Sequence, residues 1–429
     1  MELKGKKIHF VGIGGIGMSA LAQLCADHGA VVSGSDREEG PVTELLEQKG
    51  VAVSIGHKAE NVPTDAALVV YSDAVPEDNA ERARATELGI EQLSNFALLG
   101  KVSEGKKTVA VAGTHGKTTT TGMLAKILSD HGASPTAVIG SIVKDFGSNY
   151  LHGDSDVFVV EADEWKGHVL LLAPTVLVIT NLEWDHTDFY PTLAAMQDVF
   201  RKAIEKVPAE GAIITNAHNP NIAPLLAGAK AKIIDYTLET GYELRLPGEF
   251  NQQNARAAAV AAHFLMDVSQ DAIGKSLGAF HGTWRRFEYK GKSASGAEVY
   301  DDYAHHPTAV KATLEALRAK VGESKVWVAF HPHLYSRTKD LLDEFATAFG
   351  AADKVFIAPI YAAREVSDGS ISNEILAARI RAEGVDATAL DSFEAIEEAL
   401  SAAGRSDAIM TMGAGDIYKV ADRLVNHAS

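Results

Sequence analysis

The chain has very little cysteine and no excess of positive charge. Cys25 is the only cysteine among 429 residues, so no disulfide can form within the chain, and a reducing compartment is expected. The formal net charge of −17 argues against a general nucleic-acid binder and against docking on acidic membranes. An anionic substrate remains possible, because a few local cations and helix N-termini are enough to hold a phosphate group.

Long apolar runs and low-complexity tracts are also missing. The longest apolar stretch, near residues 169–179, contains Pro174 and is too short to span a bilayer. No signal-peptide pattern precedes the first strand-like segment, so we expect a cytoplasmic protein. We also expect a monomer or weak homodimer that binds neither nucleic acid nor membrane. The 46% of hydrophobic residues can fill several cores, and the length suggests about three domains.

The most informative segment is Gly113–Thr120, which reads Gly-Thr-His-Gly-Lys-Thr-Thr-Thr. It follows an apolar run, Thr108–Ala112, that is typical of a buried strand, and it leads into a helix-like stretch. A glycine loop at such a junction directs backbone N–H groups and the helix dipole at one point, which predicts a phosphate site. Lys117 would reach the terminal phosphates, and the Thr118 hydroxyl could ligate Mg²⁺. The match is imperfect, because Val111 stands where the usual nucleotide loop has its first glycine.

A second glycine loop, Gly12–Gly17, lies between a strand at Ile8–Val11 and a helix. Gly12, Gly14 and Gly17 satisfy the dinucleotide fingerprint, and Asp36 follows where a ribose-binding acid would stand. Taken alone, the loop indicates NAD, but the diphosphate of a nucleotide sugar would fit a helix N-terminus equally well. Tight packing by glycines is a third interpretation. A chain with a diphosphate loop followed by an ATP loop is more typical of a ligase than of a dehydrogenase.

Two acidic clusters follow strands of the second segment. Glu161–Glu164 ends the strand Val157–Val160, and Asn181–Asp188 follows the strand Val176–Thr180. Ligands of open parallel sheets collect at the carboxyl ends of the strands, on the same edge as the Gly113 loop. Carboxylates suit Mg²⁺, which would neutralise charge during phosphoryl transfer. The alternative is a solvated rim of acids with helix caps.

Later clusters offer amide, imidazole and guanidinium groups. Asn side chains in Gly248–Asn254 have the donors and acceptors that an adenine edge needs, although an Asn helix cap is the simpler reading for either alone. Arg285-Arg286, Asp301-Asp302 and His305-His306-Pro307 fall early in the third segment, and an Arg there could reach the γ-phosphate. His331–Arg337 follows a strand and could hold a small carboxylate.

Strand and helix signals alternate through the whole chain, which predicts three α/β units. The predicted fold class is α/β with three domains. They are a Rossmann-like nucleotide-sugar domain at residues 1–104, a central P-loop-type ATPase domain with a mainly parallel sheet at 105–282, and a C-terminal Rossmann-like α/β domain at 283–429.

In this order the motifs closely resemble those of the Mur ligases of peptidoglycan synthesis, and the resemblance covers essentially the whole chain. The motifs that carry it are Gly12–Met18, Gly113–Thr118, Glu161–Glu164, Asn181–His186, Asn251–Asn254, Arg285–Phe287 and Asp301–Pro307. The resemblance is strongest to the branch that ligates an amino acid, L-alanine, to the carboxylate of UDP-N-acetylmuramate with ATP, through an acyl phosphate.

The resemblance also implies a role for each site residue. Phosphoryl transfer would depend on Lys117, His186, Arg286 and Asp302. ATP would be bound by Gly113, Thr114, His115, Gly116, Lys117, Thr118, Thr119, Asn251, Asn254 and Arg286. Mg²⁺ would be held by Thr118, Glu161 and His186. UDP-N-acetylmuramate would contact Gly14, Gly15, Ile16, Gly17, Met18, Ser35, Asp36 and Ser72, and the small amino acid would contact His305, His333 and Arg337.

The sequence departs from the family pattern at two places. Leu334 stands where this branch usually has Arg, and Trp165–His168 replaces a run of Ser, Asp and small residues. The first departure predicts that L-alanine is not the only good acceptor, and the second affects the muramate side of the site. A recycling ligase that joins a murein tripeptide to the same nucleotide sugar is the nearest alternative, an NAD oxidoreductase a distant one, and a catalytically silent nucleotide-binding partner protein a third.

Overall fold

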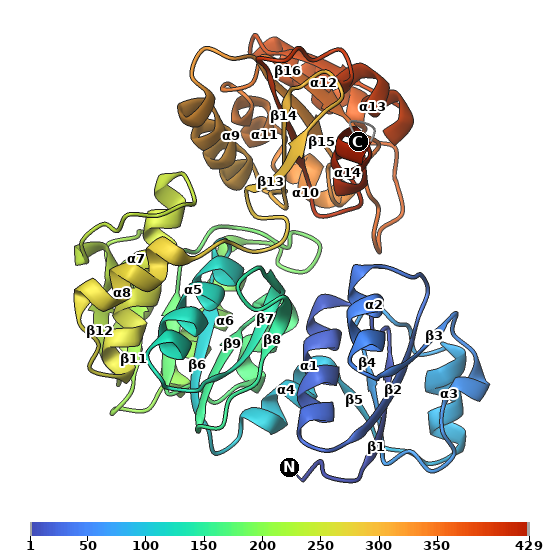
Figure 1. The fold of residues 1–429 in the computed structure, drawn as a ribbon, viewed down its shortest axis with the longest axis vertical. Helices are drawn as coiled ribbons and strands as arrows, with labels where there is room; N and C mark the ends of the chain where they lie inside the picture. The colour runs from blue at the N-terminus through green and yellow to red at the C-terminus, as the bar shows by residue number, and fades with distance from the viewer. Residues whose placement is uncertain (1, 427–429) are drawn as a thin grey trace. The chain divides into compact units, whose positions relative to one another are not determined.

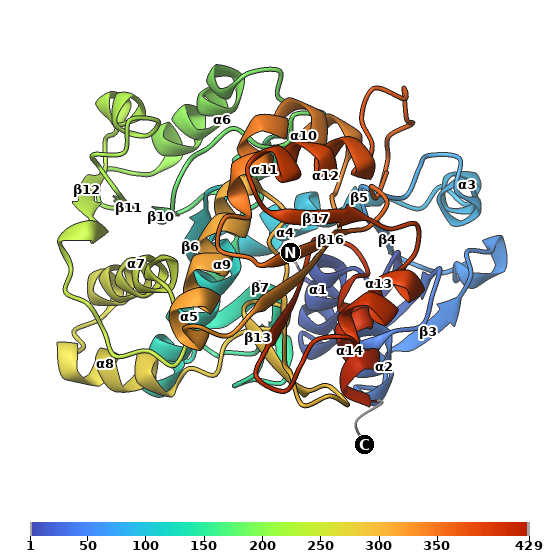
Figure 2. The same ribbon diagram turned by 90° about the horizontal axis from the view of Figure 1, so that it is seen from above.

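The computed structural model describes residues 2–426, which form three β-sheets (Figures 1 and 2). Each sheet is built from strands of only one of the three predicted segments; residue 1 and residues 427–429 of those segments lie outside the described range. The sheets have five, seven and six strands, and most neighbouring pairs are parallel. The expected α/β fold class is therefore confirmed. Within the described range, no helix has the length and apolar character needed to cross a membrane.

The residues group into two compact units. The first contains the chain up to Leu182 together with Met196–Glu243 and Asn254–Phe280, and it holds the first two sheets. The second contains Glu183–Ala195, Leu244–Gln253 and the chain from His281 onward, and it holds the third sheet. The short segment Glu183–Ala195 thus belongs with the third sheet, although it follows a strand of the second sheet in sequence.

The first sheet is parallel throughout, in the order β3-β2-β1-β4-β5. Its central strand, β1, is buried over its last four residues, which are apolar except for His9, as expected for a strand with helices on both faces. The strands are β1 (Lys7–Val11), β2 (Val31–Asp36), β3 (Ala52–Ile55), β4 (Leu68–Tyr71) and β5 (Gln92–Ser94). The helices are α1 (Ile16–Asp27), α2 (Pro41–Gln48), η1 (Ala59–Asn61), α3 (Ala80–Glu87) and α4 (Asn95–Ser103).

The second sheet has the order β12-β11-β10-β6-β9-β7-β8, with only the β7–β8 pair antiparallel. Its central strands, β6 and β10, are runs of small and β-branched residues buried on both faces. The strands are β6 (Lys107–Ala112), β7 (Thr136–Val143), β8 (Ser148–Leu151), β9 (Val157–Glu161), β10 (Val176–Ile179), β11 (Ala212–Thr215) and β12 (Lys232–Asp235). The helices are α5 (Lys117–Asp130), η2 (Trp165–Leu171), α6 (Leu193–Lys206), η3 (Ala223–Gly228), η4 (Tyr236–Leu238), α7 (Glu249–Leu265) and α8 (Gln270–Ala279).

The third sheet has the order β13-β14-β18-β15-β16-β17, and only β13 and β14 pair antiparallel. Helices α9, α11 and α12 pack on one face of this sheet, and α13 and α14 pack on the other. Each of the two faces has its own apolar cluster (Figure 1). The strands are β13 (Glu288–Lys292), β14 (Glu298–Asp302), β15 (Val326–Phe330), β16 (Lys354–Ile357), β17 (Asp386–Ala389) and β18 (Ala408–Met412). The helices are α9 (Pro307–Val321), α10 (Tyr335–Asp340), α11 (Leu342–Ala348), α12 (Asn373–Ala382), α13 (Phe393–Leu400) and α14 (Tyr418–Asn426).

A single residue separates two helices beside this third sheet. α10 ends at Asp340 and α11 begins at Leu342. Leu341, between them, has φ −112° and ψ 26°, outside the helical range, and its side chain is buried in the core. Tertiary packing of Leu341 accompanies the break that local helix propensity does not reveal.

Within the first unit, α1 lies beside β7 and β8 (Figure 1), and Figure 2 also shows α1 next to β7. Asn149 of β8 is fully buried there and donates to Ile16 O at 2.6 Å and to Ser19 Oγ at 2.8 Å. Its side-chain oxygen accepts from Gln23 Nε2 at 2.8 Å, and Ser148 Oγ donates to Gln23 Oε1 at 2.9 Å. A saturated polar seam therefore fixes α1, which starts at the first glycine loop, against the sheet that carries the second.

Asn149→Ala is expected to lower the free energy of unfolding of the first unit by about 2–3 kcal/mol, because buried groups on α1 lose their partners. Urea unfolding followed by circular dichroism measures the change. Asp154→Ala, at an exposed site just beyond the same strand, is the control and should leave the curve unchanged. An Asn149→Ala curve that overlays the wild-type curve would show that the seam contributes nothing to stability.

Candidate active site

The loop between β6 and α5 is closely packed from two sides. Gly113 and Gly116 have φ of +125° and +81°, a region that residues with a side chain rarely adopt. A Cβ on Gly113 would come within 2.2 Å of Thr180 Oγ1, and one on Gly116 within 2.2 Å of Asn254 Oδ1. Only glycine fits at either position, so the backbone of the loop packs directly against Thr180 and Asn254.

Residues after β10 support this loop from behind. Asn181 Oδ1 accepts from His115 N at 2.9 Å, and Asn181 O accepts from Thr114 N at 3.2 Å. Thr180 Oγ1 donates to His115 O at 2.6 Å. Thr114 and His115 therefore use their N–H groups inside the protein. The first turn of a helix such as α5 is where N–H groups have no partner within the helix, so phosphate binding at Gly116–Thr119 stays the prediction for this loop.

Lys117 is the first residue of α5, and its ammonium group folds back over the loop. Nζ donates to Gly113 O, to Thr114 O at 3.3 Å and to Glu164 Oε1 at 3.0 Å. Burial alone would lower the pKa of Lys117, but the negative charges of Glu164, Asp163 and Glu161 outweigh it and hold this pKa above its ordinary value. Lys117 therefore remains a cation beside the glycine loop. Its contact with Glu164 was not predicted, because the sequence assigns Glu164 no role beyond its place in an acidic motif.

Two of the three expected metal ligands are in contact. Thr118 Oγ1 donates to Glu161 Oε1 at 2.9 Å, and Glu161 Oε2 accepts from Gly140 N at 2.7 Å. A hydroxyl and a carboxylate beside a phosphate loop are the oxygen donors that Mg²⁺ takes together with phosphate oxygens and waters, so this pair fits the ion. His186, the third expected ligand, belongs to the second unit and has φ +53°.

The two asparagines expected at adenine lie in different units. Asn254, on α7, is buried against Gly116 and accepts from Thr120 Oγ1 at 3.2 Å, so it supports the phosphate loop. Asn251 is buried in the second unit and donates to Pro247 O at 2.7 Å. Their role at adenine stays a prediction.

The first glycine loop contacts its expected acid directly. Asp36 Oδ2, at the end of β2, accepts from Gly14 N at 2.8 Å, and a Cβ on Gly14 would come within 2.9 Å of that oxygen. Ser72 lies beside the same loop, 3.3 Å from the position of a Cβ on Gly12. Met18 is buried, so at this residue only the backbone remains to meet a ligand.

Ser35 is fully buried, so its expected part near the uridine stays a prediction and would be indirect. Its hydroxyl donates to Glu81 Oε2 at 2.6 Å and lies 2.9 Å from His57 Nδ1. Glu81 is itself buried and also accepts from Asn61 Nδ2 at 2.6 Å and contacts His9 Nε2 at 3.1 Å. Glu81, His57 and His9 are residues that sequence reasoning missed, since no motif marks a buried network formed by distant segments.

In the third segment the structure separates the roles of two adjacent arginines. Arg285 is buried and donates to Asp301 Oδ2 and to two carbonyls after β18, all within 2.8 Å. Arg286 is partly exposed, with its guanidinium 4.7 Å from the centre of the Tyr303 ring. Arg285 thus has a structural role, whereas Arg286 lies nearer the surface, and its contact with a ligand stays a prediction.

Asp302 holds the turn that carries Arg286. It accepts from Phe287 N at 2.6 Å and from Ala304 N at 2.7 Å, while Phe287 has φ +47°. Burial raises the pKa of Asp302 to about 6, although Arg286 and these N–H groups act in the opposite direction. The expected catalytic acid is therefore placed to position Arg286.

The expected amino-acid residues also come together, around Arg337 on α10. Arg337 is 2% exposed, and its Nη1 lies 3.1 Å from His333 Nδ1; the rings of His333 and His305 are 6.0 Å apart. Burial and the charge of Arg337 lower the pKa of His333 to about 3 and hold the pKa of His305 well below its ordinary value. Leu334, at the departure from the family pattern, is completely buried with φ +71°. Because Leu334 stands where the family pattern has Arg, Arg337 supplies the guanidinium of the cluster formed with His305 and His333.

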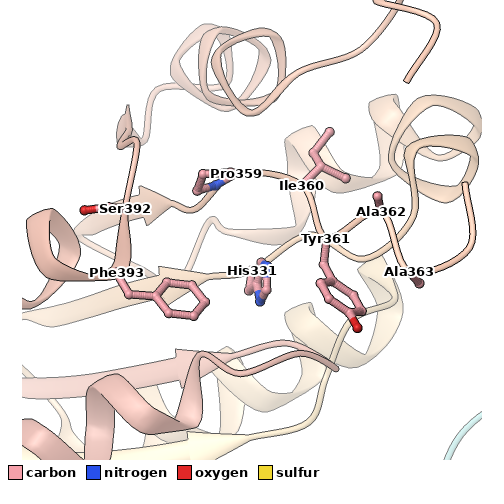
Figure 3. Close-up of a pocket in the computed structure, with 8 residues that line it drawn as sticks. All are labelled: His331, Pro359, Ile360, Tyr361, Ala362, Ala363, Ser392 and Phe393. Carbon is pink, nitrogen blue, oxygen red and sulfur yellow. The ribbon is translucent and has the colours of Figure 1, made fainter. Parts of the chain in front are cut away.

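A cavity of about 430 Å³ adjoins this cluster in the second unit (Figure 3). Tyr361 lies between the cluster and the cavity. Its ring centre is 5.4 Å from that of His333, in the cluster, and 5.7 Å from that of His331, which lines the cavity. Figure 3 shows the His331 ring between Tyr361 and Phe393. Burial lowers the pKa of His331 to about 4, so the cavity has a neutral lining. The lining residues are His331, Pro359, Ile360, Tyr361, Ala362, Ala363, Ser392 and Phe393.

The unusual segment Trp165–His168 forms a contact inside the first unit. His168 Nε2 lies 2.9 Å from Asp73 Oδ2, and its ring stacks on Phe96 with centres 3.7 Å apart and planes 14° apart. Burial opposes the charge of His168, but Asp163 and Asp73 outweigh it and raise its pKa above 6.5. The hydrogen bond from His168 lowers the pKa of Asp73. The segment thus links the loop after β4 to the second sheet.

Three family models match successive parts of the chain. They are described as the Mur ligase family, catalytic domain (residues 7–107), the Mur ligase middle domain (residues 111–244) and the Mur ligase, glutamate ligase domain (residues 285–415). Together they cover each of the three sheets that the site residues border.

Full-length relatives and structures are similar to the chain. The UDP-N-acetylmuramate–L-alanine ligase of Acetivibrio thermocellus is 40% identical, over 98% of this chain and 95% of the relative, and that of Clostridium botulinum is 37% identical, over 99% and 98%. The structure of the UDP-N-acetylmuramate–alanine ligase of Thermotoga maritima has a TM-score of 0.81 at 28% identity, covering 98% of each chain. A murein peptide ligase of Psychrobacter arcticus has a TM-score of 0.77 at 26% identity, covering 99% of each chain.

The His168–Asp73 pair predicts how the stability of the first unit changes with pH. Because folding raises the pKa of His168, its contribution is complete below pH 6.5 and is lost as pH rises through the folded pKa; the Asp73 contribution is lost only as pH falls below its ordinary value of 3.8. His168→Gln should therefore unfold at lower urea than wild type at pH 6 and approach wild type at pH 9. His218→Gln, at an exposed ring, is the control. An equal deficit of His168→Gln at both pH values would contradict an ionised pair.

Proposed function

The chain belongs to the Mur ligase family, and we propose that it is an ATP-dependent ligase that joins L-alanine to the carboxylate of UDP-N-acetylmuramate. The observation that carries this proposal is the identity of 40% over nearly the full length of a ligase with that activity. The site supports it, because a glycine loop at a helix N-terminus, a partly buried lysine and a hydroxyl–carboxylate pair are the groups that phosphoryl transfer from ATP needs.

Each sheet contributes one part of the proposed reaction. The loop Gly12–Gly17 would hold the diphosphate of the nucleotide sugar at the N-terminus of α1, and Gly116–Thr119 would hold the phosphates of ATP at the N-terminus of α5. Thr118 and Glu161, with His186, would bind Mg²⁺, which supplies neutralisation of phosphate charge when bound. The cluster around Arg337 would receive the amino acid.

The chemistry then proceeds in two steps. An oxygen of the muramate carboxylate attacks the γ-phosphorus, and ADP leaves, giving an acyl phosphate. The amine of the amino acid attacks the acyl carbon, inorganic phosphate leaves, and an amide remains. Lys117 and Arg286 stabilise the charge on the transferred phosphoryl group, and Asp302 keeps Arg286 in place through the turn at Phe287.

Lys117→Ala is expected to lower turnover by about 10²–10³-fold or more, because a partly buried cation at the transferred phosphoryl group is removed. Binding of the nucleotide sugar, measured by calorimetry, should stay nearly intact, since the first glycine loop belongs to a different sheet. Lys126→Ala, further along the same helix, is the matched control and should retain activity. Loss of turnover and sugar binding together would mean that the two nucleotide sites are wrongly assigned.

The acceptor is tested by ADP release with UDP-N-acetylmuramate and Mg-ATP across L-alanine, glycine, L-serine and the murein tripeptide. We expect L-alanine to be used, with glycine and L-serine within about tenfold of it in kcat/KM, because Leu334 provides no second guanidinium to fix the acceptor and the cavity beside Tyr361 leaves room. Strong selectivity for L-alanine would contradict the relaxed acceptor site. Release with the tripeptide alone would instead support a recycling ligase, to which the murein peptide ligase fold is also similar.

A further inference from the structure

Asp185 has an unusual distribution of contacts for a buried carboxylate. It is 3% exposed, and Oδ1 accepts from Arg337 Nε at 2.8 Å and from His186 N at 2.6 Å. The second guanidinium contact, Arg337 Nη2 at 2.7 Å, also goes to Oδ1. Every one of these contacts converges on the same oxygen, and Oδ2 takes part in none of them.

Arg337 contacts Asp185 through one oxygen only. A guanidinium can bind both oxygens of one carboxylate through two parallel hydrogen bonds, but here Nε and Nη2 share a single oxygen of Asp185. The remaining nitrogen, Nη1, contacts His333 Nδ1 at 3.1 Å and His333 O at 3.3 Å. The second oxygen of Asp185 therefore lies outside the contacts that hold this pair together.

The groups around the pair add no further opposing charge to Arg337. His305 and His333 have pKa values far below neutrality, so both rings are uncharged hydrogen-bond partners. The neighbouring cation, Arg364, pairs with Asp188 on the same segment as Asp185. Asp185 and Arg337 thus form one anion and one cation side by side, both nearly excluded from water.

A buried ion pair is weak evidence for stability, because desolvating two charges costs about as much as their attraction returns. A ligand with its own two opposite charges is a different matter. An α-amino acid carries its ammonium and carboxylate groups on the same carbon atom, so a complementary site needs a carboxylate and a guanidinium next to each other. The Asp185–Arg337 pair has that composition.

We propose that Asp185 binds the α-ammonium group of the acceptor amino acid through Oδ2, while Arg337 binds its α-carboxylate. The inference rests on the proposed function, because it assigns the acceptor of that reaction. Asp185 then selects for a free amino acid over a simple carboxylate, and its ion pair with Arg337 orients both partners before the acceptor arrives.

The test compares L-alanine with propionate, which keeps the carboxylate and lacks the ammonium group. In Asp185→Asn, the KM for L-alanine should rise about 10–100-fold, as for a lost hydrogen bond between charged groups, with the KM for ATP and for the nucleotide sugar unchanged. The Ki of propionate should stay equal or fall, because Arg337 no longer has a competing carboxylate. A higher KM for L-alanine without a higher Ki for propionate supports the proposal, whereas equal weakening of both indicates a purely structural pair and overturns it.

Asp188→Asn is the matched control, since it breaks the neighbouring pair with Arg364 on the same segment and should leave both constants unchanged. A second measurement needs no variant: on the wild-type protein the Ki of propionate should exceed the KM of L-alanine by about tenfold or more. Near-equal constants overturn the proposal even if Asp185→Asn does not fold. A wild-type protein that releases no ADP with L-alanine defeats the proposed function itself, whereas an active one with an unchanged Asp185→Asn defeats only this assignment.

Discussion

The rest of the site depends on one steric constraint, the absence of room for any side chain at Gly113 and Gly116. β6 delivers the chain to the carboxyl edge of the second sheet, and the loop then turns tightly into α5 with two left-handed glycines. Thr180 and Asn254 press on it from either side, at distances that a Cβ would not allow. Because the loop is held this closely, the first turn of α5, the Lys117 ammonium and the Thr118 hydroxyl all have fixed positions relative to Glu161 and Glu164 on β9 and after it.

Three ion pairs lie at the candidate site residues, and they differ in how many hydrogen bonds hold the cation of each pair. Arg285 uses its guanidinium entirely on Asp301 and two carbonyls, which is a structural role. Lys117 is held by Glu164 and loop carbonyls, which are contacts that a phosphate can replace without leaving the cation uncompensated. Arg337 contacts a single oxygen of Asp185 through Nε and Nη2, which is the arrangement on which the proposed acceptor site rests.

Much of this could be predicted from sequence, because glycine loops, apolar runs and acids at strand ends are local signals. The α/β class, the three sheets and the Thr118–Glu161 contact follow from such signals. The different environments of Arg285 and Arg286 could not be predicted, because the two residues are identical neighbours. Arg285 donates to carbonyls after β18, which is far away in sequence. Asp185 lay inside a motif read for its metal ligand, and its partner is 152 residues away in sequence. The burial of Ser35 beneath His57 and Glu81 likewise arises from packing between segments that no spacing rule connects.

The central claim is that the chain activates the muramate carboxylate by phosphorylation, as the positions of Lys117, Thr118 and Glu161 imply. The most direct measurement places ¹⁸O in the carboxylate of UDP-N-acetylmuramate and follows the label by mass spectrometry of the inorganic phosphate released during ligation. Attack of the carboxylate on the γ-phosphorus transfers one labelled oxygen to each phosphate released. Unlabelled phosphate accompanied by amide formation would contradict the account.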